Sequence, residues 1–105
     1  MNKILLCCAG GMSTSMLMQR MEKEAKEQGI AVEMQAVGFD EFADQIAAWD
    51  CCLLGPQIKY KLVEFQAIAA EKQKPVAVIN TMDYGMMNGK KVLHDALALI
   101  QSHGE

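Results

Sequence analysis

The stretch that decides the fold runs from Lys3 to Met21 and reads KILLCCAGGMSTSMLMQRM. It begins as a short apolar run, passes through two adjacent glycines, and continues through Ser-Thr-Ser into a segment with apolar residues at helical spacing. A strand that feeds a glycine turn and a hydroxyl-rich helix start is how α/β proteins build sites for anions. Because Cys8 stands where the turn begins, the stretch predicts an α/β fold with a thiol beside an anion site.

The rest of the chain repeats this alternation of strand and helix. The patterns predict strands at residues 3–8, 30–37, 51–54 and 76–79, and helices at residues 13–28, 40–49, 59–72 and 89–102. Asp40 is expected to cap the second helix, and residues 80–88 are expected to form a loop. The strands are continuous apolar runs, which favours a parallel sheet covered on both faces. We therefore expect one domain over residues 1–105, an open four-stranded parallel sheet with helices on both faces.

Three segments are expected to meet at one edge of this sheet. In open parallel sheets, ligands bind beyond the carboxyl ends of the strands, where the winding direction reverses. Cys8 ends the first strand, Gly55-Pro56-Gln57 follows the third, and Tyr84 follows the fourth. Gly55, Pro56 and Gln57 either form only a strand-ending turn or contribute to the rim of the site or to partner contacts. Tyr84 either covers the same rim or packs beneath it.

The composition excludes several classes of function. The chain is 51% hydrophobic and 22% charged with a net charge of -3, which gives no basic footprint for nucleic acid. Its longest apolar runs fall far short of the ~20 residues that a membrane helix needs, and no signal-peptide core is apparent at the N-terminus. We therefore expect a cytoplasmic protein that neither binds nucleic acid nor inserts into a membrane.

The four cysteines occur as two adjacent pairs, Cys7-Cys8 and Cys51-Cys52. Neighbours in sequence are poorly placed for a disulfide with each other, and the spacing is not that of a zinc site. We expect no metal and no cofactor. Since successive side chains of a strand point to opposite faces, Cys7 should pack in the core while Cys8 faces the loop. Cys51 and Cys52 are also expected to pack in the core.

The loop after Cys8 has the composition of a phosphate cradle, and its predicted members are Ala9, Gly10, Gly11, Met12, Ser13, Thr14 and Ser15. Glycines let the backbone turn tightly, and the hydroxyls can cap the helix or bind an anion. A helix start favours a nearby negative charge by up to ~2 kcal/mol. Cys8 is therefore expected to ionise readily, and the same backbone amides would hold the phosphoryl oxygens if the sulfur became phosphorylated.

Cysteine phosphatases use the pattern C-x5-R, in which an arginine clamps the phosphate. Thr14 occupies the arginine's place here, and the single arginine, Arg20, lies further along the predicted helix. The loop also contains neither histidine nor acid to activate water. Two alternatives stay open. One is a low-molecular-weight cysteine phosphatase or reductase, although the arginine that stabilises the phosphate in that class is missing from the loop. The other is a non-catalytic regulatory module. A phosphoryl group on Cys8 is expected to persist until another molecule takes it.

Three motifs carry a resemblance that covers nearly the whole chain: C-x-x-G-M-S-T-S from Cys8 to Ser15, L-L-G-P-Q-I from Leu53 to Ile58, and Tyr84-Gly85. With them the chain resembles enzyme IIB components of the lactose/cellobiose (chitobiose) class of the bacterial sugar phosphotransferase system. The first motif is the most specific because it joins a cysteine, a glycine turn and a hydroxyl-rich cap at fixed offsets. Cys7 and the Cys51-Cys52 pair depart from the pattern without breaking a motif.

The resemblance implies a cytosolic phosphotransferase. Cys8 would accept a phosphoryl group from a phosphohistidine of an enzyme IIA partner, and residues Ala9 to Ser15 would hold the phosphate. The group would pass to a sugar held by the membrane permease, enzyme IIC. The sugar implied is a β-linked disaccharide such as cellobiose, chitobiose or lactose.

Overall fold

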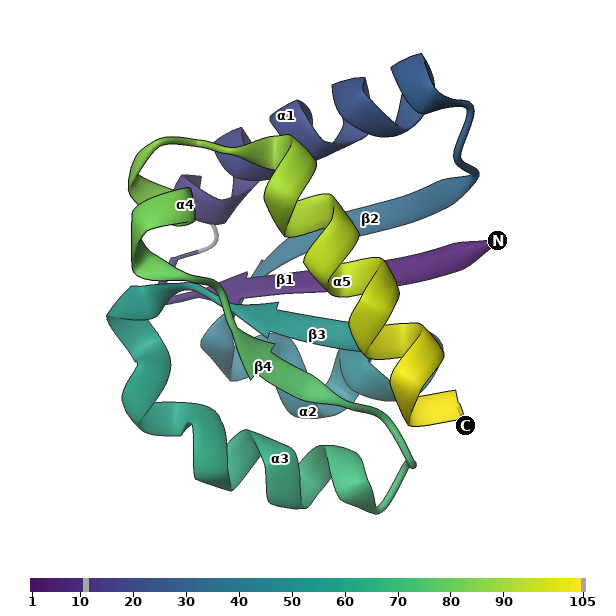
Figure 1. Ribbon diagram of the computed structural model, residues 1–105. Coiled ribbons are helices and arrows are strands. Elements are labelled where there is room, and N and C mark those ends of the chain that lie inside the picture. Colours follow the sequence, from purple (N-terminus) through teal and green to yellow (C-terminus); the bar gives the residue numbers. More distant parts are fainter. Residues whose placement is uncertain (11, 105) are drawn as a thin grey trace.

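The computed structural model describes residues 1–10 and 12–104 and shows one four-stranded parallel sheet (Figure 1). The strand order is β2-β1-β3-β4, and every neighbouring pair is parallel. The strands are β1 (Asn2–Cys8), β2 (Val32–Gly38), β3 (Cys51–Leu54) and β4 (Val76–Val78). The predicted fold class is confirmed, and the bounds of β3 match the prediction in full.

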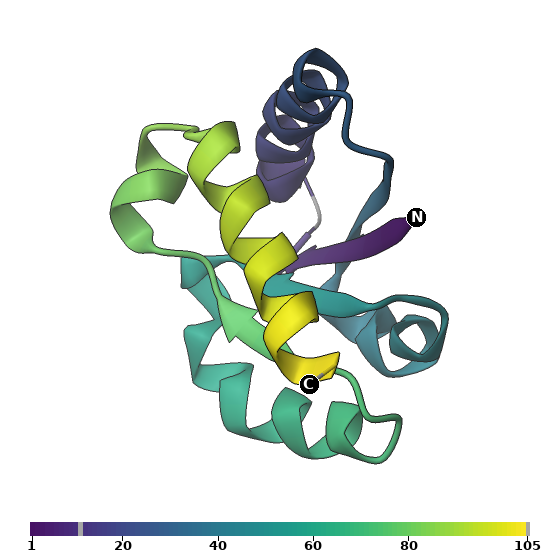
Figure 2. The same cartoon turned by 45° about the vertical axis from the view of Figure 1, so that its right-hand side comes forward.

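Helices cover both faces of the sheet (Figures 1 and 2). The α-helices are α1 (Met12–Gln28), α2 (Phe42–Gln45), α3 (Leu62–Ala70), α4 (Thr81–Gly85) and α5 (Gly89–Gly104). Short 3-10 turns are η1 (Phe39–Glu41), η2 (Ile46–Ala48) and η3 (Pro56–Lys61). The helices α1 and α5 lie side by side on one face, and α2 and α3 lie on the other.

Several predicted segments differ from the structure. The helix expected over residues 59–72 begins within the 3-10 turn η3 and ends as α3 at Ala70, and the strands expected over residues 30–37 and 76–79 are shifted or shortened by one or two residues. The single helix expected over residues 40–49 is the succession η1, α2 and η2, and the residue that precedes η1 is Gly38, so Asp40 is not a cap. The loop expected over residues 80–88 contains the short helix α4. The Asn80 side chain caps this helix, since its oxygen accepts hydrogen bonds from the N–H groups of Met82 and Asp83 at 2.9 and 3.1 Å.

The sheet separates two apolar clusters. Alternate residues of β1 contribute to each: Ile4 and Leu6 pack under α1 and α5, whereas Leu5 packs under α2 and α3. In the second cluster the rings of Phe42 and Phe65 stack with their centroids 4.1 Å apart. Burial of these apolar faces, rather than any single polar contact, holds the helices against the sheet.

The helices α1 and α5 touch through backbone at Gly89. A Cβ built on Gly89 would lie 2.6 Å from the backbone carbon of Arg20 and 2.8 Å from its carbonyl oxygen. Only a residue without a side chain therefore fits at the first position of α5.

Within the described residues, none of the helices combines the length and the apolar character that crossing a membrane requires.

Candidate functional site at the end of the first strand

Cys8 lies at the point where the winding of the sheet reverses. The strand β1 pairs with β2 on one side and with β3 on the other. The chain therefore moves outward from β1 to β2 and then crosses back to β3 before continuing to β4. Ligand sites of open parallel sheets form beyond the carboxyl ends of the strands at such a reversal, and Cys8 is the last residue of β1.

Glycines stand beside Cys8 in both neighbouring chain segments. Gly38 of β2 is its register partner. On the other side Gly55 follows β3, and its N–H donates to the carbonyl oxygen of Cys7 at 2.8 Å. A Cβ on Gly55 would lie 3.3 Å from the Cβ of Cys8. Neither neighbouring position carries a side chain of its own, and the atoms nearest to the two empty Cβ sites are the side-chain oxygens of Asp40 and Gln57. Cys8 itself is only 3% exposed.

The side chain of Thr14 makes a polar contact with the Cys8 sulfur. Its side chain is fully buried, and its hydroxyl donates to the Cys8 Sγ at 3.5 Å. Thr14 occupies the place of the phosphatase arginine, so a neutral hydroxyl faces the sulfur where that class of enzyme has a cation. The arrangement favours holding a thiolate or its derivative over clamping a separate phosphate.

The structure brings the beginning of α1 next to Cys8. The helix starts at Met12, only four positions beyond the sulfur, and the first N–H groups of a helix have no partner within it. Ala9 and Gly10 are exposed, and Ser15 is half-buried. Gly11 lies outside the described residues, as do the side chains of Met12 and Ser13, so their predicted roles remain predictions.

The predicted rim residues divide between surface and core. Pro56 is half-buried and Gln57 is exposed, and the Gln57 side-chain oxygen lies 2.7 Å from the position of a Cβ on Gly55. Gln57 therefore folds over the glycine beside Cys8. Tyr84 is only 9% exposed and belongs to the core under α1 and α5, so of its two predicted alternatives the structure shows packing. Its buried hydroxyl has no hydrogen-bond partner among the described residues.

The sequence did not connect two further residues, Gly38 and Asp40, with the candidate site. One carboxylate oxygen of Asp40 lies 2.9 Å from the position of a Cβ on Gly38, and one of Glu41 lies 3.9 Å from it. The Gly38 N–H donates to Glu41 Oε2 at 3.2 Å. The available signal was the segment Gly38-Phe-Asp-Glu directly after the second strand, which ends at the same edge as Cys8.

Cys7, Cys51 and Cys52 are buried free thiols that belong to the two core clusters, as predicted. Burial raises the pKa of Cys51 to about 12, with a smaller contribution from the charge of Asp50. Burial likewise raises the pKa of Cys52 well above its ordinary value. These thiols are therefore protonated at neutral pH and are not nucleophiles.

We expect the folded state to lose stability as the pH rises from about 9 to about 12. The thiol of Cys51 ionises near 9.0 when the chain is unfolded and near 12 when it is folded. In this window the unfolded state releases a proton that the folded state keeps, which costs up to about 1.4 kcal/mol per pH unit for each such thiol. Measured unfolding free energies of Cys51→Ala should fall less steeply over this range than those of the wild type. Parallel curves would contradict the pKa shift.

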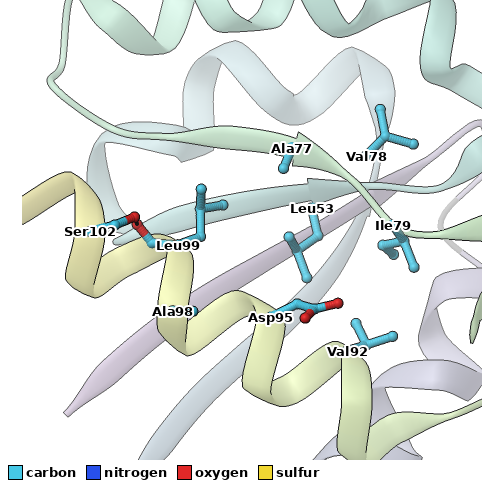
Figure 3. A pocket seen from close by; sticks show the side chains of 9 residues that line it. All are labelled: Leu53, Ala77, Val78, Ile79, Val92, Asp95, Ala98, Leu99 and Ser102. Atoms are coloured by element: carbon cyan, nitrogen blue, oxygen red, sulfur yellow. Dashed lines mark hydrogen bonds between the residues drawn. The ribbon is translucent and has the colours of Figure 1, made fainter.

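A separate apolar pocket of about 320 Å³ lies between the sheet and α5 (Figure 3). Its lining comes from β3, from β4 with the residue after it, and from α5, including Leu53, Ile79 and Leu99. Asp95 at its edge is ion-paired with Lys91 at 2.8 Å.

In the described part of the chain, no group of three or more His, Cys, Asp or Glu side chains could hold a metal ion.

The fold and the site define a class: a small α/β domain with a thiol at the carboxyl end of its first strand and a helix N-terminus beside it. Residues 3–95 match the family model of the lactose/cellobiose-specific IIB subunit of the PTS system. The chain therefore belongs to the lactose/cellobiose family of phosphotransferase-system IIB components. Members of this family are phosphotransferases that take part in sugar transport.

Individual relatives agree with this assignment. The chain is 41% identical over 100 residues to the oligo-beta-mannoside-specific EIIB component of Bacillus subtilis (strain 168), covering 95% of this chain and 97% of that protein. It is 39% identical over 95 residues to the cellobiose-specific EIIB component of Lactococcus lactis subsp. lactis (strain IL1403), covering 86% and 88%. It superposes with a TM-score of 0.82 on the cellobiose-specific IIB component of Borrelia burgdorferi, at 39% identity, covering 97% and 94%.

Proposed function

We propose that Cys8 carries the phosphoryl group between two partner proteins. The Cys8 thiolate attacks the phosphorus of a phosphohistidine on enzyme IIA, so that a sulfur–phosphorus bond forms as the nitrogen–phosphorus bond breaks. The freed imidazole takes up a proton. A sugar hydroxyl bound in enzyme IIC then attacks the same phosphorus, and the proton of that hydroxyl is released as Cys8 returns to the thiolate.

One observation carries this proposal: the sulfur of Cys8 stands at the reversal point of the sheet, beside the start of α1 and between two glycines. Phosphoryl transfer depends mainly on positioning and on stabilising the charge of the phosphoryl oxygens. The N–H groups that begin α1 supply partial positive charge for those oxygens. The hydroxyl of Thr14 already donates to the sulfur, and we assign the whole segment Ala9 to Ser15 to binding the phosphate.

The segment Gly55-Pro56-Gln57 lies beside Cys8 and is proposed to shape the rim that the partners meet. Tyr84 supports the same edge from below, since it is buried under α1 and α5. The sugar is proposed to be a β-linked oligosaccharide such as cellobiose, because one relative is named for cellobiose and another for oligo-beta-mannosides. The chain is proposed to act in the cytoplasm, where enzyme IIA and the inner face of enzyme IIC are found.

Intact-mass measurement after incubation with a phosphorylated enzyme IIA tests the proposal. A carrier gains ~80 Da, the mass of one phosphoryl group, and keeps it when the donor is removed. Addition of enzyme IIC in vesicles with cellobiose should then return the mass to that of the unmodified chain. A chain that gains no mass contradicts the proposal. A chain that releases inorganic phosphate continuously from an aryl phosphate is instead the phosphatase alternative.

A further inference from the structure

A carboxylate lies near the Cys8 side chain, on the neighbouring strand's side. Gly38 and Cys8 are register partners, so they project to the same face of the sheet. The position that a Gly38 side chain would occupy is next to the Cys8 side chain, since neighbouring strands are about 4.8 Å apart. The Oδ1 atom of Asp40 lies next to this position, 2.9 Å from the Cβ site of Gly38. The carboxylate of Asp40 is therefore within about 8 Å of the Cys8 Cβ, given that strand spacing.

We infer that Asp40 raises the free energy of the phosphocysteine and so keeps the phosphoryl group ready to leave. This inference rests on the proposed function of Cys8. A phosphorylated side chain carries a charge of about −1.5 to −2 at neutral pH. The charge of Asp40 repels this group, whereas the start of α1 attracts it. A carrier must pass the phosphoryl group on to the next acceptor. A site that only attracted this group would make the phosphocysteine too stable for efficient transfer.

The surroundings of Asp40 leave its charge available for this role. Asp40 is exposed, and it forms no ion pair within the described part of the chain. The nearby Lys61 instead pairs with Glu64 at 3.7 Å and stands 5.3 Å from the ring centre of Phe39. Glu41 differs from Asp40 because its carboxylate accepts the Gly38 N–H, and this bond fixes the entry into η1. Removing Glu41 would therefore disturb the backbone, whereas Asp40 can be neutralised with little change of shape.

The field of Asp40 reaches the end of β1. The pKa of Cys7, the residue before Cys8, is raised to about 12, first by burial and then by the negative charges of Cys8, Asp40 and Glu41. Asp44, one turn further along, is not among these causes. Asp44 is also exposed, so it provides a matched control of the same residue type in the neighbouring helix α2.

The test compares phosphoryl exchange equilibria of the wild type, Asp40→Asn, Asp40→Glu and Asp44→Asn. Each is incubated with a fixed ratio of phosphorylated and unphosphorylated enzyme IIA, and the fraction of chain carrying the added group is read by intact mass. We expect Asp40→Asn to raise the equilibrium constant for phosphocysteine about tenfold, since one like charge near the group is removed. Asp40→Glu and Asp44→Asn should remain within about twofold of the wild type, because both keep the charge beside Cys8.

Ionic strength provides a second readout that a purely structural role would not change. The excess of Asp40→Asn over the wild type should shrink between 0.05 and 0.5 M salt, because salt screens an exposed charge over about 10 Å or less. Equal equilibrium constants for the wild type and Asp40→Asn would overturn the inference while leaving the carrier function intact. A wild-type chain that takes up no phosphoryl group would overturn both.

Discussion

Cys8→Ser is expected to lose phosphoryl uptake by at least about 100-fold, because a protonated serine hydroxyl is a far weaker nucleophile than a thiolate. The fold should survive, since serine differs from cysteine by one atom and the Thr14 hydroxyl can donate to the new oxygen as it does to the sulfur. The measurement is the mass of the intact chain after incubation with phosphorylated enzyme IIA, together with the thermal unfolding midpoint.

Cys7→Ala is the matched control for the adjacent thiol. Cys7 is fully buried in the cluster under α2 and α3, on the other face of the sheet from Cys8. This variant should take up the phosphoryl group like the wild type even if its stability falls. Uptake that survives in Cys8→Ser but disappears in Cys7→Ala would move the acceptor to the neighbouring residue and contradict the site described above.

Gly89→Ala is expected to reduce the free energy of unfolding by about 1–3 kcal/mol, the usual cost of inserting a methyl group into a packed interior. The new Cβ would lie 2.6 Å from the backbone carbon of Arg20, and backbone cannot move aside as a flexible side chain can. The helices α1 and α5 must therefore separate locally. For a domain of this size, the midpoint should fall by roughly 4–8 °C for each kcal/mol.

Gly85→Ala is the control for this substitution. Gly85 ends α4, and a Cβ there would meet nothing within 4 Å. Its effect should stay within about 0.5 kcal/mol of the wild type. If denaturant titrations gave the two alanine variants equal stability, the close contact between α1 and α5 would not be a constraint on the fold.

The fold was predictable from sequence because its strands are short apolar runs separated by glycine and proline. The run Cys51–Leu54 ends at Gly55-Pro56, and the structure places β3 on those same residues. The segment between β2 and β3 was predicted less well. Phe42 and Ile46 are four residues apart and both buried, as in a helix. The segment is short, however, and the free-energy cost of starting a helix is spread over few residues. The segment therefore forms successive short turns instead of one helix.

The place of the candidate site was predictable to the extent that it depends on one strand and the loop after it. Cys8, the start of α1 and the nearby Gly55 all follow from the rule that ligands bind at the carboxyl edge. The position of Asp40 depends on β2 pairing directly with β1. Apolar runs of equal character do not reveal the order of strands in a sheet, so a carboxylate 32 positions away along the chain could not be assigned to the sulfur beforehand.

The pair of glycines on either side of the sulfur has a consequence for how partners recognise this molecule. The atoms nearest to these two glycine positions are the ends of the Asp40 and Gln57 side chains. A phosphoryl group added to Cys8 therefore asks side chains rather than backbone to move, and the sheet and its helices keep one shape whether the carrier is loaded or empty. The donor and the acceptor would then meet the same surface in turn. Only the negative charge of the phosphoryl group at the end of β1 would then distinguish the loaded carrier from the empty one.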